Sequence, residues 1–283
     1  MIHERSAFRV LDYAHAGYGG SRLRFRAPPP VPRGPHCVIL GGTETYGKFV
    51  QHPYPAQLEA RIGRPVINLG CLNAGPDAFL SDPALLSACR KATVRVVQIV
   101  GAHNLSNAFY TVHPRRNDRF LAAKPALCAL YPDVDFAQFS FTRHLLGTLR
   151  HLCGHRFGYL VAALRATWTV RMMQLLGAIG QPALLFRISS ACGHAAAPDD
   201  PLRHGLVTRD MVACIARTAT GVVVGSVPLA IMAKGTEGMI HDPLDLPAAQ
   251  LMPNPAAHAA LAEALAPEVT HLMARRARIG RSM

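Results

Sequence analysis

The sequence lacks several signatures that define large classes of protein. Its seven cysteines are odd in number and include no Cys-x-x-Cys pair. Because disulfide frameworks use paired cysteines, we predict free thiols and a reducing compartment. The sequence contains no P-loop and no Gly-x-Gly-x-x-Gly segment, which argues against nucleotide binding. We therefore predict no cofactor. The short run from His151 to His155 has no further ligands to complete a metal site, so none is predicted.

Long apolar runs are also absent. No stretch of about 18 or more residues is apolar and free of charge, so we predict no membrane-spanning helix. The first twenty residues carry early charges and no long apolar segment, unlike a signal peptide. These two absences favour a soluble cytoplasmic protein.

Acidic residues are scarce. The chain has 17 Asp and Glu against 30 Lys and Arg, which gives a formal charge of +13. Such a balance attracts phosphates, nucleic acids, acidic glycans or membrane surfaces, or simply produces a solvated basic surface. Nucleic acid is not the partner we expect, because no aromatic platform or known binding module is present. A small anionic or carbohydrate- or lipid-type substrate is the expected partner, and the oligomeric state stays open.

Short apolar runs alternate with helical segments after residue 35. The apolar runs are 36–42, 64–75, 94–104, 182–190 and 221–230. The helical segments are 54–63, 82–92, 142–179, 206–219 and 256–278. This alternation predicts an α/β fold of three layers, with about five mostly parallel strands flanked by helices. Residues 1–35 read as a basic, proline-rich arm, and residues 36–283 as a single α/β domain with a loop insertion near 105–140.

Three polar segments follow the first three apolar runs. They are Gly-Gly-Thr-Glu-Thr-Tyr-Gly at 41–47, Asn-Leu-Gly-Cys-Leu-Asn-Ala-Gly at 68–75 and Gly-Ala-His-Asn at 101–104. Ligands of open α/β sheets bind beyond the carboxyl ends of the strands. We therefore place the candidate site at these segments, where small residues allow close backbone approach and free N–H groups can hold an oxyanion.

The ordered set of segments resembles the SGNH (GDSL-type) hydrolase superfamily. That superfamily has a Gly-Asp-Ser block, a glycine block, a Gly-x-Asn-Asp block and a final Asp-x-x-His before the last helix. The segment Met-Pro-Asn-Pro at 252–255 is similar to the His-Pro-Asn that commonly ends this last block. More closely, the segments SRLRF, GGTETYGKFV, VINLGCLNAGPDAFL and FYTVHPRRNDRF are similar to a bacterial domain family of unknown function within or near it. The resemblance implies an SGNH or flavodoxin-like fold and an esterase or acyltransferase activity.

The chain departs from that pattern at the catalytic positions. Gly42 stands at the Asp position and Thr43 at the Ser position of the first block. In the third block, His103 replaces Asn and Asn104 replaces Asp. Met252 occupies the place of the catalytic His, and a methionine cannot accept a proton. The usual dyad is therefore absent.

The candidate catalytic residues follow from these departures. Thr43 is either a nucleophile or a turn and helix-cap hydroxyl. His103 is either a replacement base or a polar group lining the strand end. His241, with Asp242 or better Asp245 to orient it, is either a relocated base or part of an ordinary polar loop.

The candidate binding residues are small, amide or basic. An oxyanion would be held by the backbone or side chains of Gly42, Gly70, Asn73, Gly75 and Asn104; the alternative is that the glycine and asparagine positions form tight turns. In the basic run 113–119, Arg115 and Arg116, together with Arg119, would clamp an anion, unless they lie in a solvated loop.

Two functions follow. The first is an SGNH-like esterase or acyltransferase with a non-standard catalytic set, acting on an anionic or carbohydrate- or lipid-type substrate. The second is a catalytically degenerate SGNH-like module that binds an anionic ligand or a protein partner in the same cleft.

Overall fold

The computed structural model describes residues 11–15, 17–26, 32, 34–189, 202 and 205–279. About half of the predicted amino-terminal arm, residues 1–10, 16, 27–31 and 33, lies outside the described residues. Of that arm, residues 34 and 35 lead directly into the first strand.

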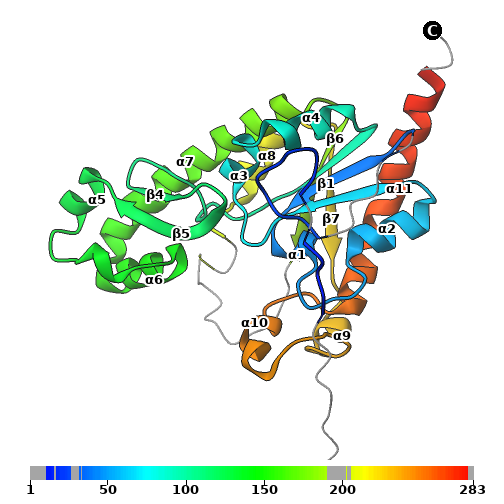
Figure 1. Ribbon diagram of the computed structural model, residues 1–283. Coiled ribbons are helices and arrows are strands. Elements are labelled where there is room, and N and C mark those ends of the chain that lie inside the picture. The colour runs from blue at the N-terminus through cyan, green and yellow to red at the C-terminus, as the bar shows by residue number, and fades with distance from the viewer. Residues whose placement is uncertain are drawn as a thin grey trace, which may run out of the picture.

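A five-stranded parallel sheet forms the centre of the molecule (Figure 1). Its strands are β1 (Cys37–Gly41), β2 (Val66–Gly70), β3 (Val94–Gln98), β6 (Ala183–Ser189) and β7 (Gly221–Ser226). The spatial order is β2-β1-β3-β6-β7, and every neighbouring pair is parallel. This is the flavodoxin-like order 2-1-3-4-5, counted along the chain. The predicted α/β sheet of about five strands is confirmed.

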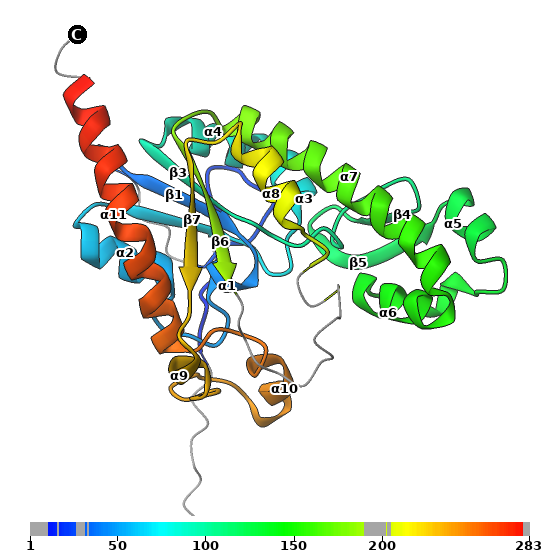
Figure 2. The ribbon, with the colours of Figure 1, turned by 180° about the vertical axis from the view of Figure 1, so that it is seen from behind.

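Helices cover both faces of the sheet (Figures 1 and 2). One face packs against α2 (Tyr54–Ile62) and α11 (Pro255–Ile279). The other face packs against α3 (Pro76–Leu80), α4 (Pro83–Lys91), α7 (Gly154–Ile179) and α8 (Arg209–Ala216). Alternate residues of a strand point to opposite faces, so each strand supplies both cores. In β1, Val38 and Leu40 enter one core, while Cys37 and Ile39 enter the other.

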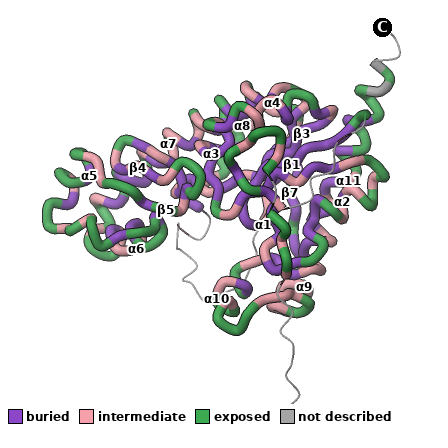
Figure 3. Tube along the Cα trace, in the orientation of Figure 1, coloured by how far each residue is buried: buried purple, intermediate pink, exposed green. Residues whose placement is uncertain are grey.

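An insertion projects from one end of this sandwich (Figure 1). It begins with a hairpin of β4 (Tyr110–His113) and β5 (Arg116–Ala123) and continues through α5 (Pro125–Leu130), η1 (Phe136–Gln138) and α6 (Thr142–Leu152). The expected loop near 105–140 thus contains a hairpin and a helix. Figure 3 shows that the insertion has its own buried residues among exposed ones.

Short helices complete the carboxyl edge of the sheet. They are α1 (Thr43–Tyr46), directly after β1, and α9 (Leu229–Met232), η2 (Pro243–Asp245) and α10 (Leu246–Ala249), between β7 and α11. Across the described part of the chain, none of the helices combines the length and apolarity needed to cross a bilayer.

Candidate functional site

The three predicted loops meet at the carboxyl edge of the sheet. Thr43 opens α1 after β1, Asn73 lies between β2 and α3, and Asn104 follows β3. Asn73 bonds to both of the others: its side chain accepts from Thr43, and its carbonyl accepts from Asn104 Nδ2 at 3.1 Å. The structure therefore brings together residues that stand about 30 positions apart in sequence.

Thr43 uses its hydroxyl group for two hydrogen bonds to the same residue. Oγ1 donates to Asn73 Oδ1 at 3.1 Å and accepts the Asn73 backbone N–H at 3.0 Å. The side chain is buried, and no imidazole among the described residues bonds to it. A threonine nucleophile needs a base to take its proton, and an amide oxygen is not one. In this geometry the Thr43 hydroxyl group links α1 to the loop after β2 through two hydrogen bonds.

The backbone N–H groups predicted to hold an oxyanion already have acceptors inside the protein. Gly42 N–H donates to Gln98 Oε1, and Gly70 N–H donates to Asn68 Oδ1, both at 2.9 Å. Asn73 N–H donates to Thr43 Oγ1 at 3.0 Å, and Gly75 N–H donates to Asn117 Oδ1 at 2.8 Å. An oxyanion hole needs donors aimed at the reacting oxygen and free to bond it. These four donors are engaged instead in holding the loops together.

Asn104 is engaged in the same way. Besides the bond from its Nδ2 to the Asn73 carbonyl, its Oδ1 accepts from Thr142 Oγ1 at 2.7 Å. Thr142 is the first residue of α6, so Asn104 connects the sheet edge to the insertion. Its side chain is buried and has a partner for both polar atoms.

Close packing explains the glycine at two of the predicted positions. A Cβ atom on Gly70 would overlap the backbone of Tyr46, and one on Gly75 would overlap the carbonyl oxygen of Asn104. Any larger residue would force the loops apart. The tight-turn interpretation of these glycines therefore has a physical basis in the structure.

His103 is placed near the network but does not join it. The residue is partly exposed, yet its Nδ1 atom is buried and has no hydrogen-bond partner among the described residues. Burial and, to a smaller extent, the charge of Arg143 lower the pKa of His103 to about 4, against the opposing charge of Asp118. At neutral pH the ring is therefore uncharged and a weak base, whereas an efficient general base has a pKa near the working pH.

His241 lies on the loop between α9 and η2. Its Nδ1 donates to the carbonyl of Asp242 at 2.9 Å, and its ring contacts the edge of Phe49, with centroids 6.0 Å apart. Asp245 pairs with Lys48 at 3.8 Å instead of with the imidazole. Neither predicted carboxylate orients His241, and the described contacts do not bring it to Thr43.

Charged residues of the hairpin extend the network outward. Asp118 accepts from Asn73 Nδ2 at 3.2 Å and forms a two-point ion pair with Arg116, with N–O distances of 3.1 Å. The hydrogen bond to Asp118 raises the pKa of Arg116. Thus Thr43, Asn73, Asp118 and Arg116 form one continuous chain from the sheet edge to β5.

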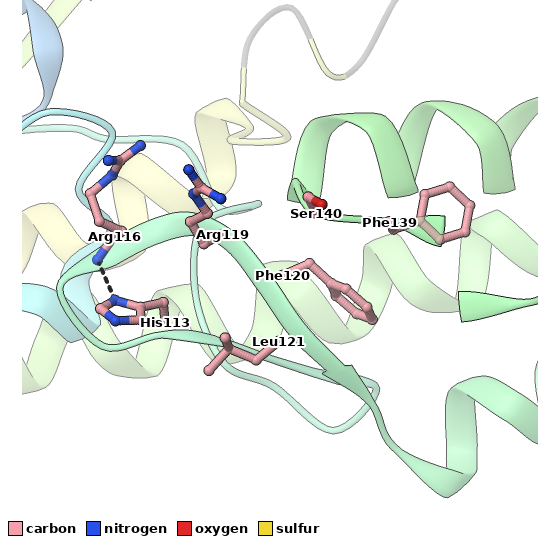
Figure 4. Close-up of a pocket in the computed structure, with 7 residues that line it drawn as sticks. All are labelled: His113, Arg116, Arg119, Phe120, Leu121, Phe139 and Ser140. Atoms are coloured by element: carbon pink, nitrogen blue, oxygen red, sulfur yellow. Dashed lines mark hydrogen bonds between the residues drawn. The ribbon is translucent and has the colours of Figure 1, made fainter. Parts of the chain in front are cut away.

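Beside this chain the hairpin forms a cavity of about 400 Å³ (Figure 4). Its polar lining comes from His113, Arg116, Arg119 and Ser140, and its apolar lining from Phe120, Leu121 and Phe139. Arg119 lies 4.7 Å above the ring of Phe141, and no carboxylate of the described residues is within ion-pair distance of it. Arg115 is exposed and does not line the cavity.

Sequence reasoning missed the side of this cavity that Phe139 and Ser140 form. These residues lie well after the end of β5 at Ala123 and are held against the hairpin by a bridge between Arg119 and Phe141. No local sequence pattern predicts such a contact between distant segments. Within the described residues, no group of three or more His, Cys, Asp or Glu side chains is placed to hold a metal ion.

The fold and site define an α/β module with a flavodoxin-like sheet and a polar network at its carboxyl edge. The chain belongs to the family described as Domain of unknown function (DUF6473), whose model matches residues 1–273. A search of curated proteins finds no match.

Several solved structures share the general course of the chain. A carbohydrate esterase family 2 enzyme plus carbohydrate binding domain from Corynascus thermopiles (Myceliophthora fergusii) is 11% identical with a TM-score of 0.45, covering 88% of this chain and 69% of that one. An extracellular lipase from Streptomyces rimosus is 14% identical with a TM-score of 0.43, covering 84% and 100%. A salicylyl-acyltransferase from a tetracycline biosynthetic pathway is 12% identical with a TM-score of 0.39, covering 86% and 57%. Similarity at this level carries no argument about activity.

Proposed function

We propose that this protein is a catalytically degenerate SGNH-like module that binds a small amphiphilic anion in the hairpin cavity. The observation that carries the proposal is the engagement of every predicted oxyanion donor at Gly42, Gly70, Asn73 and Gly75 in internal hydrogen bonds. With Thr43 bonded to an amide and to no imidazole of the described residues, the sheet edge serves as a scaffold. The guanidinium of Arg119, which has no carboxylate partner among the described residues, lies at the cavity next to this edge.

The chemistry of the cavity favours an acid with an apolar body. Arg119 has no carboxylate partner among the described side chains, so its guanidinium can bind a carboxylate or phosphate through two N–H groups. His113 Nδ1 accepts backbone N–H groups at 3.2 Å, which leaves its Nε2–H as a further donor. Phe120 and Phe139 provide the surface for an acyl chain or aromatic ring. We therefore propose a fatty or aryl carboxylate as the ligand class.

Calorimetric titration with octanoate and with neutral octanamide tests this function. We expect octanoate to bind, octanamide to bind at least about tenfold more weakly, and Arg119→Gln to weaken octanoate binding by about tenfold or more. Arg115→Gln is the matched control, because Arg115 is an exposed neighbour outside the cavity. Equal affinity for acid and amide, or equal losses in the two variants, would contradict the proposal.

A second candidate function is ester hydrolysis or acyl transfer with Thr43 as the nucleophile. One observation favours it: Thr43 follows β1 at the carboxyl edge, where ligands of open α/β sheets bind. It requires the Asn73 side chain to move and a base such as His103 to approach. Turnover of acyl nitrophenols that Thr43→Val abolishes would establish this function and displace the first; identical background rates in both proteins would exclude it.

A further inference from the structure

A second group of basic side chains lies at the opposite, amino-terminal edge of the sheet. Arg90 ends α4, Arg95 lies in β3, and Arg276 lies near the end of α11. These three residues line one cavity of about 370 Å³, whose wall also includes Thr93 and Met273. In Figure 2, α4 and the red carboxyl half of α11 both lie at the upper end of the sheet. The cavity is therefore separate from the Thr43 network and from the hairpin.

Arg95 is a buried cation with no counterion among the described residues. Its side chain is 5% exposed, and its three hydrogen bonds go to the carbonyls of Cys89 at 2.8 Å, Gln181 at 3.1 Å and Arg90 at 2.5 Å. No carboxylate of the described residues lies within ion-pair distance of it. Buried arginines are rarely left unpaired, because removing the charge from water is costly.

The two neighbouring arginines add charge without neutralising it. Arg90 donates to the carbonyl of Ala178 at 3.1 Å, and Arg276 donates to that of Gln181 at 2.9 Å. Each guanidinium has five N–H groups, so most of their donors remain available. The carboxyl end of α4 contributes only about half a negative charge. Burial lowers the pKa of Arg95, and the charge of Arg276 acts in the same direction.

We propose that this cavity binds the phosphate group of a small phosphorylated molecule. Three guanidinium groups around one space match a doubly charged oxyanion, and the planar guanidinium pairs with phosphate through two bonds. Thr93 Oγ1 accepts the backbone N–H of His36 at 3.2 Å, which leaves its own hydrogen free to donate.

The rest of the lining indicates what the phosphate is attached to. The cavity is larger than a phosphate group, and Pro35, Ala92 and Met273 form an apolar wall. No aromatic side chain of the described residues lines it, so they provide no stacking platform for a nucleobase there. A sugar phosphate or a short aliphatic phosphate fits this combination of charge and shape.

Calorimetry on the full chain with ribose 5-phosphate, inorganic phosphate and duplex DNA tests the site. We expect ribose 5-phosphate to bind with one site per chain and more tightly than inorganic phosphate. Arg276→Gln and Arg90→Gln should each weaken it by about tenfold, because each removes one ion pair to phosphate. Both residues are exposed and make a single hydrogen bond, so both variants are expected to fold. Arg275→Gln, an exposed neighbour on α11 outside the cavity, should change the affinity less than about twofold.

The alternative outcomes are distinct. Absence of ribose 5-phosphate binding at low salt overturns the site, and so do equal losses in Arg275→Gln and Arg276→Gln, which would indicate general attraction by the basic surface. Binding of DNA alone, with steep salt dependence, overturns it as well. Arg119→Gln should leave ribose 5-phosphate binding unchanged, so this site and the hairpin site can fail separately.

Discussion

At the residue scale, Thr43 shows how one hydroxyl group joins two distant loops. It donates to the side chain of Asn73 and accepts from the backbone of the same residue. Asn73 has a positive φ of 54°, a conformation that asparagine tolerates better than most residues. The two bonds hold that loop conformation in place. In the structure, the residue that most resembles a nucleophile in sequence makes a structural contact between these loops.

Replacing the hydroxyl group by a methyl group measures this role. We expect Thr43→Val to lower the free energy of unfolding by about 1–3 kcal/mol, because an Asn73 donor and acceptor lose their partner in a buried place. Thr43→Ser keeps the hydroxyl and should lose less than about 1 kcal/mol. Urea unfolding provides the measurement. Thr169→Val, on the partly exposed face of α7, is the control. If it lowered the free energy of unfolding as much as Thr43→Val does, the proposed stabilising role of the Thr43–Asn73 hydrogen bonds would be contradicted.

At the element scale, the hairpin β4–β5 is bound to the sheet edge through Asn117. Its Oδ1 accepts from the backbone N–H groups of Gly75 at 2.8 Å and Ala78 at 3.2 Å. Helix α3 has glycine as its own N-cap, with no side chain to satisfy these groups. Asn117, which is 0% exposed, supplies the cap from another element.

Removing this cap should loosen both elements. Asn117→Leu should lower the free energy of unfolding by about 2–4 kcal/mol, since it removes the cap and the bonds that Nδ2 donates to the carbonyls of His113 and Pro114. Asn117→Asp keeps the acceptor and should lose less. Hydrogen exchange should quicken at the Gly75 and Ala78 amides and stay unchanged in β6. Uniformly faster exchange throughout the sheet would contradict a local cap.

The sequence predicted elements better than contacts. The apolar run at 36–42 identified β1 because a buried parallel strand reads as continuous hydrophobic residues, here ending in glycine. The hairpin escaped prediction because its turn and second strand, Arg-Arg-Asn-Asp-Arg-Phe, are mostly polar, and its register is irregular. The meeting of the three polar loops followed from the strand ends, but their hydrogen-bond partners did not. Asn117 stands 42 residues from Gly75, and no local pattern encodes that bond.

At the scale of the whole molecule, charge and burial are distributed unevenly. Two cavities rich in arginine lie in different parts of the molecule, one in the insertion at the hairpin and one beside Arg95 at the central sheet. The formal charge of +13 therefore includes arginines gathered around cavities as well as a solvated surface. Within the same fold, His258 is fully buried at the start of α11, where its Nδ1 accepts the Tyr54 N–H at 3.0 Å.

Buried His258 makes stability depend on pH. Burial lowers the pKa of His258 to about 3, and the charge of Arg26 acts in the same direction. An exposed histidine has a pKa of about 6.5, so below that pH the unfolded chain binds a proton that the folded chain excludes. Stability from this residue is therefore complete above about pH 6.5 and falls as the pH drops toward the folded pKa, by at most about 1.4 kcal/mol per pH unit.

Comparison with His258→Asn isolates this contribution, because asparagine can still accept the Tyr54 N–H while it cannot titrate. Urea unfolding from pH 7.5 to 4.5 should show a less steep loss of stability in the variant than in the wild type, by up to about one proton. The variant should also be less stable at pH 7.5, since the shorter side chain leaves a cavity against Tyr54. His151→Asn, at an exposed position of α6, should run parallel to the wild type. If His258→Asn also ran parallel, His258 would have to titrate alike in the folded and unfolded chains, and its burial beneath Tyr54 would carry no electrostatic cost.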